Sequence, residues 1–227
     1  MKLAVFGCSW SYGTSQHQDI KKSQPNWVRS LAKLRPDISI TNFAFPGTSL
    51  GFSCLLHNQF ASEFDYTVFQ ITAPRRFTSW PDYFDFKEYM IQYQDNLVQF
   101  NSTSAFSYIK RLNPSLVEFD LGITNGLFNG TRLPVNFTKN YYKFLPEEYL
   151  WFEYNTLITY ISSKVNLLFY HIYDDEWPLQ KQNTKLPAVQ KILTQKQFQN
   201  YVLDEGHHFN QAGCEWQANY INDKYLQ

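Results

Sequence analysis

The sequence predicts an α/β fold: a three-layer α/β/α sandwich with a mostly parallel sheet of about five strands. Three observations favour this class. Short apolar, β-branched runs alternate with segments of helical periodicity, and three strand–helix units are complete by position 75. The 227 residues are enough to bury the core of one large domain. We therefore expect a single domain over residues 1–227.

The first 75 residues contain three expected strands and two expected helices. Each strand is an apolar or β-branched run that a glycine or proline turn signal ends, and each helix has apolar residues three and four positions apart. The expected strands are 2–6, 38–45 and 65–72, and the expected helices are 25–34 and 52–64. In the first helix, Trp27, Leu31 and Leu34 share one helical face.

Residues 76–145 interrupt this alternation. They are rich in Phe, Tyr, Asn and Ser, and three Asn-Pro or Asn-Gly pairs mark turns within them. Connections of this length are unusual in a compact domain unless they have a function of their own. We expect an aromatic-rich insertion that forms a lid or a wall over the carboxyl ends of the strands.

The alternation then returns in the last third of the chain. We expect a helix over 146–163, a strand over 165–173, a short fifth strand over 198–203 and a final helix over 214–221. Between the fourth and fifth strands stands the acidic run Asp174-Asp175-Glu176, which suits a solvated loop, a cation or a sugar hydroxyl.

Composition excludes several classes of partner. Lys plus Arg equal Asp plus Glu at 20 each, so no net field favours nucleic acid or an anionic membrane. No apolar run reaches the ~18 to 20 residues of a membrane span, and no segment has the length of a signal sequence core. Three scattered cysteines suggest no disulfide framework. We expect a cytoplasmic protein, and the sequence leaves its oligomeric state open.

Aromatic residues make up 19% of the chain, which is well above ordinary usage. Such rings line carbohydrate-binding grooves, and they serve equally well in an aromatic-rich core.

Ser9 is the first candidate site residue. It follows the first expected strand at the turn Gly7-Cys8-Ser9, and ligands bind at the carboxyl edge of open parallel sheets. Three readings of this turn stay open: Ser9 as a nucleophile, Cys8 as a rival nucleophile, and an ordinary strand–helix turn in which a serine caps the helix.

A second candidate segment, Asp204-Glu205-Gly206-His207-His208, lies near the carboxyl terminus. An acid three residues before a histidine can orient the imidazole within one loop. With Ser9, the segment supplies the hydroxyl, base and carboxylate that a serine nucleophile needs. A metal site is the weaker alternative, because adjacent histidines bind one metal poorly and no other His lies nearby in sequence.

These segments resemble three of the four blocks of the SGNH hydrolases, the GDSL-type esterases and lipases. The family has Gly-Asp-Ser with a nearby Gly, then Asn followed by Gly at a strand end, and last Asp-x-x-His with a following Asn and Gly. The similar residues here are Gly7, Ser9, Gly13, Asn42, Gly47, Glu205, His208, Asn210 and Gly213.

The chain departs from the family pattern at three points. Cys8 stands where Asp is usual, and Glu205 replaces the aspartate. The third block, Gly-x-Asn-Asp, is absent after the third expected strand, where the chain reads Thr72-Ala73-Pro74-Arg75.

The resemblance implies an SGNH (flavodoxin-like) fold and a serine esterase or acyltransferase without metal or cofactor. Ser9 would be the nucleophile, His208 the base and Glu205 its carboxylate partner, with Asp204 and His207 as the rival pair. The oxyanion would be bound by the backbone N–H groups of Ser9 and Gly47. A third oxyanion contact would come from Thr72 or from Arg75 or Arg76.

Family members cleave esters of sugars, lipids and small acids, and the aromatic content favours an acetylated carbohydrate. Two other functions stay open. One is an SGNH-fold carbohydrate-binding or structural module with weak or lost catalysis. The other is a nucleotide-binding protein, which the two glycines of the Gly7–Gly13 turn and the absence of a lysine there disfavour.

Overall fold

A four-stranded parallel sheet forms the centre of the computed structural model, which describes residues 1–13, 25–44, 49–71, 147–170, 192–203 and 208–227. The strands are β1 (Lys2–Phe6), β2 (Ser39–Asn42), β3 (Tyr66–Ile71) and β4 (Leu167–Tyr170), in the order β2-β1-β3-β4. Their register pairs Val5 of β1 with Asn42 of β2 and with Val68 of β3.

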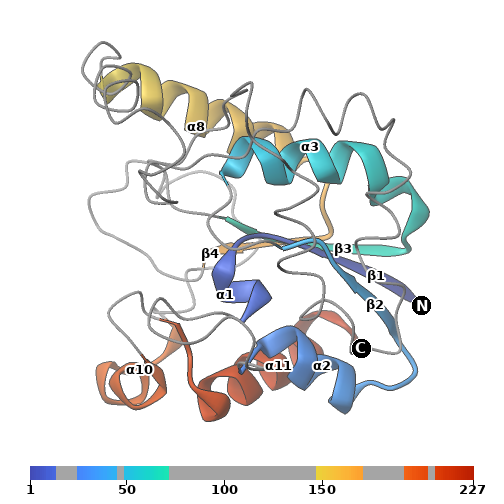
Figure 1. Cartoon of the computed structure of the whole chain (residues 1–227), viewed down its shortest axis with the longest axis vertical. Helices are drawn as coiled ribbons and strands as arrows, with labels where there is room; N and C mark the ends of the chain where they lie inside the picture. The colour runs from blue at the N-terminus through green and yellow to red at the C-terminus, as the bar shows by residue number, and fades with distance from the viewer. Residues whose placement is uncertain (14–24, 45–48, 72–146, 171–191, 204–207) are drawn as a thin grey trace, which may run out of the picture.

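Helices cover both faces of the sheet (Figure 1). One layer holds α3 (Leu50–Phe60), the 3₁₀ turn η1 (Ala61–Glu63) and α8 (Glu147–Ser162); the other holds α2 (Trp27–Leu34) and α11 (Gln211–Tyr225). This arrangement confirms the predicted α/β class and its three layers.

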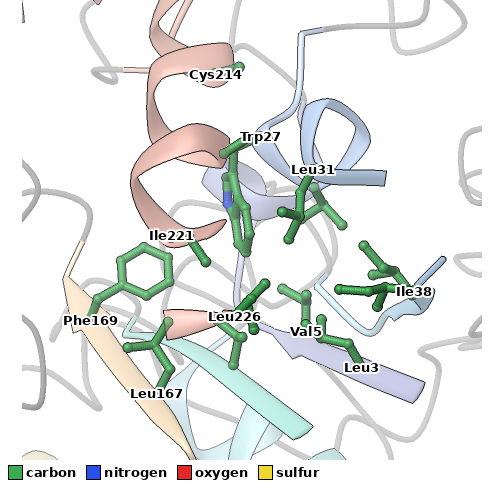
Figure 2. Close-up of a cluster of buried hydrophobic side chains, with 14 of the residues drawn as sticks. Leu3, Val5, Trp27, Leu31, Ile38, Leu167, Phe169, Cys214, Ile221 and Leu226 are labelled. Atoms are coloured by element: carbon green, nitrogen blue, oxygen red, sulfur yellow. The ribbon is translucent and has the colours of Figure 1, made fainter. Parts of the chain in front are cut away.

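Alternation along the strands directs their side chains to the two layers. Leu3 and Val5 of β1, Val68 of β3 and Leu167 of β4 belong to the core beneath α2 and α11, which Figure 2 shows around Trp27 and Ile221. The rings of Trp27 and Phe169 meet edge to face, with centroids 5.8 Å apart.

The other face is aromatic. Phe6 of β1 stacks on Phe43, at a centroid distance of 5.0 Å, and Phe43 in turn stacks on Phe60 of α3 at 5.3 Å. His57 of α3 lies edge-on to Phe6 and Phe69, with centroids 5.1 Å and 6.2 Å away. The high aromatic content thus serves the core, at least over this face.

The prediction of a fifth strand over 198–203 is wrong. Residues 195–201 form α10 (Gln195–Tyr201), and only Val202 makes an isolated antiparallel bridge, to Phe209. Phe198, Tyr201 and Val202 are spaced as one helical face. Thr194 also begins α10 with a capping box, in which Gln197 is the reciprocal partner.

The apolar face of α2 is covered along only part of its length. Trp27 and Leu31 are buried, whereas Leu34, the last residue of α2, is 41% exposed. On α8, Tyr154 and Ile161 are buried and Leu157 is half-buried, and the three residues are three or four positions apart, as on one helical face.

Three predicted segments lie wholly or almost wholly outside the described residues: the insertion at 76–145, the acidic run Asp174–Glu176 and the turn with Gly47. Across the described part of the chain, no helix combines the length and apolarity that crossing a membrane requires.

Candidate active site

Ser9 is the first residue of the one-turn helix α1 (Ser9–Tyr12), which follows β1 after Gly7 and Cys8. The carbonyl of Cys8 accepts hydrogen bonds from the backbone N–H groups of Ser11 and Tyr12, both at 3.0 Å. Gly13 ends the turn in the left-handed conformation, with φ 93°, and donates its N–H to the carbonyl of Ser9. The serine is thus held at the carboxyl edge of the sheet, as predicted.

His208 lies against this serine. Its Nε2 is 2.9 Å from Ser9 Oγ, and both residues are buried, with 7% and 9% of their surface exposed. With the ring proton on Nδ1, Nε2 accepts the hydrogen bond of the serine hydroxyl. A hydroxyl and an imidazole within hydrogen-bond distance form the core of a serine nucleophile.

Short-range contacts hold His208 in place. Leu203 N–H donates to the carbonyl of His208, and Asn210 N–H donates to the carbonyl of Tyr201, both at 2.7 Å. Asn210 also caps α11, because its side chain accepts from the N–H of Gly213 at 3.0 Å. These bonds connect the His208 segment to α10 and α11, so His208 comes from a link between two helices and not from the end of a fifth strand.

Gly213 has a packing role in this segment. A Cβ atom at position 213 would lie 2.8 Å from Cβ of Tyr201 and 2.9 Å from Cγ of Phe209. Only glycine lets α11 approach Phe209 so closely, and Phe209 is the neighbour of His208.

Cys8 does not face the histidine. It is fully buried, and its Sγ lies 3.7 Å from Nε2 and 4.0 Å from Oε1 of Gln70. The other two cysteines are also buried, and burial raises the pKa of the Cys54 and Cys214 thiols to about 12. The geometry therefore favours Ser9 over Cys8 as the nucleophile.

An aromatic ring stands beside the pair. The ring centroids of Trp10 and His208 are 6.5 Å apart, and the rings are tilted by 52°. Trp10, the residue after Ser9, is half-buried.

The remaining predicted site residues lie outside the described residues. These are Gly47, Thr72, Arg75, Arg76, Asp204, Glu205 and His207. The structure thus unites the predicted hydroxyl and imidazole, and the carboxylate and the other oxyanion donors stay predictions. Among the described residues, no group of three or more His, Cys, Asp or Glu side chains could hold a metal ion.

Sequence reasoning missed one residue beneath the site, Gln70 of β3. Its side chain is fully buried and accepts a hydrogen bond from Ser11 Oγ at 2.8 Å. A signal was present in the sequence: within the buried strand Tyr66–Ile71, Gln70 is a polar residue on the same side as Val68. A buried amide needs hydrogen-bond partners, and here the partners belong to the Ser9 turn.

Asn42, at the end of β2, also bonds to that turn. Its Nδ2 donates to the carbonyl of Ser11 at 2.9 Å, and its Oδ1 accepts from the N–H of Ala44 at 3.0 Å. Asn42 therefore connects the Ser9 turn to the start of the segment that carries Gly47.

No family model matches the sequence, and no curated protein matches it. Among solved structures, the chain is similar to a lipase/acylhydrolase from Enterococcus faecalis, at 14% identity and a TM-score of 0.46. The alignment covers 98% of this chain and 94% of that one. A likeness this distant carries no functional argument, so any function must be inferred from the residues of the site.

Proposed function

We propose that the chain is a serine hydrolase that cleaves or transfers the acyl group of an ester, with Ser9 as nucleophile and His208 as base. The observation that carries this proposal is the 2.9 Å distance between Ser9 Oγ and His208 Nε2 at the carboxyl edge of the parallel sheet. That edge is where open α/β sheets bind their ligands. The resemblance to the SGNH hydrolases supports the same assignment from the sequence.

In the proposed reaction, Ser9 Oγ attacks the ester carbonyl carbon while its proton passes to His208 Nε2. The backbone N–H groups of Ser9 and Gly47 stabilise the oxyanion, with Thr72 as a third contact. The tetrahedral intermediate then collapses, and the alcohol leaves with the proton from His208. Water or a second alcohol repeats these steps on the acyl-enzyme.

Glu205 is proposed to accept a hydrogen bond from Nδ1–H of His208, which fixes the tautomer and stabilises the imidazolium. The rival pair, Asp204 with His207, is disfavoured because His208 is the histidine found at Ser9. Glu205→Gln should lower kcat by about 10³- to 10⁴-fold, whereas Asp204→Asn should have little effect. The reverse result would assign the carboxylate to Asp204.

For the substrate, we propose an acetylated carbohydrate. The half-buried ring of Trp10 next to His208 offers an apolar face beside the reacting atoms, and aromatic faces suit sugar rings. Trp10→Ala should raise KM for an acetylated sugar more than for a small aryl acetate. Equal changes for both substrates would remove the sugar preference.

The proposal is tested by labelling the purified protein with a fluorophosphonate and locating the adduct by mass spectrometry. We expect one adduct, on Ser9, and none in Ser9→Ala. Ser62→Ala, at an exposed serine of η1, is the matched control and should label like the wild type. A wild-type protein that neither reacts nor hydrolyses any acyl ester, yet binds a glycan, would instead be a non-catalytic module.

The oxyanion contact is tested separately. Thr72→Ala should lower kcat more than it changes KM, because an oxyanion donor acts mainly in the transition state. Unchanged kinetics would remove Thr72 from the site.

A further inference from the structure

We propose that Gln70 is a positioning residue that holds Ser9 in its reactive geometry by fixing the one-turn helix α1 from the neighbouring strand. This inference rests on the proposed function, since it concerns the same nucleophile. It adds a residue that none of the matched sequence blocks contains.

A chain of hydrogen bonds runs from α2 through the Ser9 turn to β3. Trp27 Nε1–H donates to Ser11 Oγ at 3.0 Å, and Ser11 Oγ–H donates to Gln70 Oε1 at 2.8 Å. Gln70 Nε2 donates in turn to the carbonyl of Ile71 at 3.0 Å. All three side chains are fully buried.

Each hydrogen bond in this chain has a defined direction. An indole N–H can only donate, so Ser11 Oγ accepts from Trp27, and its own hydroxyl donates to Gln70 Oε1. Gln70 presents its oxygen to Ser11, and its amide N–H donates to the carbonyl of Ile71. The orientation of each side chain therefore depends on the next one, and an apolar residue at position 70 would leave the Ser11 hydroxyl without an acceptor.

Gln70 contacts the turn on both sides of Ser9 in sequence. Before Ser9, its amide lies 3.7 Å from Cys8 Sγ, and a Cβ atom at position 7 would be 2.9 Å from its Oε1. After Ser9, it bonds to Ser11. The buried amide of Gln70 thus contacts Cys8 before Ser9 and Ser11 after it.

Helix α1 needs such support because it is too short to be stable alone. It has four residues, and Cys8 gives it no side-chain cap. Asn42 donates to the carbonyl of Ser11 at 2.9 Å, and Asn26 donates to the carbonyl of Tyr12 at 2.5 Å. Both carbonyls belong to residues that follow Ser9, so these bonds hold only that side of the turn. Among the side-chain hydrogen bonds of the described residues, only those of Gln70 reach both Cys8 and Ser11.

Gln70 acts through the turn and not on the substrate. Its side chain has no exposed surface, and both ends of its amide are hydrogen-bonded. A displacement of a reacting group by about 1 Å costs on the order of 100-fold in rate. Loss of the Gln70 contact should therefore appear in kcat and leave substrate binding almost unchanged.

The test compares Gln70→Met, which keeps the length of the side chain but removes the hydrogen bonds, with Thr67→Val. Thr67 is a matched control: it is buried in the same strand, and its Oγ1 lies 3.1 Å from Asn166 Oδ1 at the other end of β3. Gln70→Met removes buried hydrogen bonds and Thr67→Val removes a part-buried one, and both should lower the melting temperature. All rates are measured at a temperature at which circular dichroism shows each variant to be folded.

With a short-chain aryl ester, Gln70→Met should lower kcat by about 100-fold with less than about a threefold change in KM. The rate of fluorophosphonate labelling should fall in parallel. Thr67→Val should keep both rates within about twofold of the wild type. The double variant Gln70→Met with Ser11→Ala should lose no more activity than the worse single variant, because both break one network.

A readout independent of activity is the indole N–H resonance of Trp27 in ¹⁵N-labelled protein. It should shift in Gln70→Met and Ser11→Ala and stay in place in Thr67→Val. If Gln70→Met moves this resonance but keeps the labelling rate and the kcat of the wild type, Gln70 has only a structural role and the inference is wrong. If the wild type itself is not labelled, the proposed function fails, and that result is obtained before any Gln70 variant is made.

Discussion

Gln70 and His57 are both buried and polar, but they lie on opposite faces of one sheet, and the fold compensates for their burial in different ways. Gln70, on the α2 and α11 side, has both ends of its amide hydrogen-bonded. His57, on the α3 side, lies edge-on to Phe6 and Phe69, and neither of its ring nitrogens has a hydrogen-bond partner among the described residues.

The two solutions have different consequences. Burial, assisted by the positive charge of Lys164, lowers the pKa of His57 to about 4, so this ring stays neutral at physiological pH. A neutral ring without directed bonds tolerates replacement by other side chains of similar size. Gln70 instead imposes directions on its neighbours, and the neighbours of Gln70 carry the candidate nucleophile.

The largest expected difference between the two faces is the effect of a His→Gln substitution on kcat. His208→Gln should lower kcat on an aryl ester by about 10⁴-fold or more, because the base is lost. His57→Gln, the same exchange on the other face, should leave kcat within a few fold. His207→Gln serves as the register control and should also be active. Loss of activity in His207→Gln with an active His208→Gln would overturn the assignment of the base.

The second prediction concerns stability in acid. The pKa of His57 is about 4 in the folded chain and about 6.5 in the unfolded chain, so the unfolded state binds more protons between these values. The stabilisation is complete above about pH 6.5 and is lost as the pH falls through 4, with a total of about 3 kcal/mol. Urea unfolding at pH 7 and pH 4.5 should show a smaller loss for His57→Gln than for the wild type. Equal losses would mean that the pKa of His57 is not lowered in the fold.

The third prediction tests how tightly the Ser9 turn is packed. Gly13 has φ 93°, and a Cβ atom there would lie 2.8 Å from the carbonyl oxygen of Pro25. Gly13→Ala should therefore lower the free energy of unfolding by about 2 kcal/mol. Gly51→Ala, in the first turn of α3 on the other face, should be neutral or stabilising by up to about 0.5 kcal/mol. Similar values for both variants would show that the turn is not constrained at Gly13.

The smallest expected effect concerns the hydrogen bonds that join the two helices within each layer. Arg35, after α2, donates to Asn222 Oδ1 and to the carbonyl of Leu226 at the end of α11, whereas Tyr160 of α8 makes one exposed hydrogen bond to Asn58 of α3. A lysine cannot reproduce the fork of an arginine. Arg35→Lys should lower Tm by roughly 2 to 4 °C and Tyr160→Phe by less. A larger fall for Tyr160→Phe would reverse this ranking of the two layers.

The sequence predicted those parts of the fold in which one short pattern decides the outcome. Buried apolar runs located β1 and β3, and helical spacing located α8 and α11. The prediction of a fifth strand over 198–203 was wrong because the spacing of Phe198, Tyr201 and Val202 and the Thr194 cap are helical. The exposure of Leu34 shows that periodicity gives the face of a helix but not how far the covering layer extends along it.

The site was predictable to a similar degree. Parallel strands end at one edge, so the topology itself favoured a meeting of Ser9 with a residue from another segment. Gln70 was not predicted, because its role depends on Cys8 and Ser11 of the Ser9 turn and, through Ser11, on Trp27 of α2, and no local pattern encodes their positions.

The separation of Ser9 and His208 in sequence determines when the proposed activity can arise during synthesis. The two residues are 199 positions apart, so at about 5 to 20 residues per second the ribosome adds the histidine roughly 10 to 40 seconds after the serine. Until then the serine is an ordinary alcohol without a base. The apolar face of α2 is also uncovered in this interval, because α11 is made last. Under the proposed function, the nascent chain is therefore unreactive toward esters but exposed to aggregation, and docking of α11 ends both conditions together.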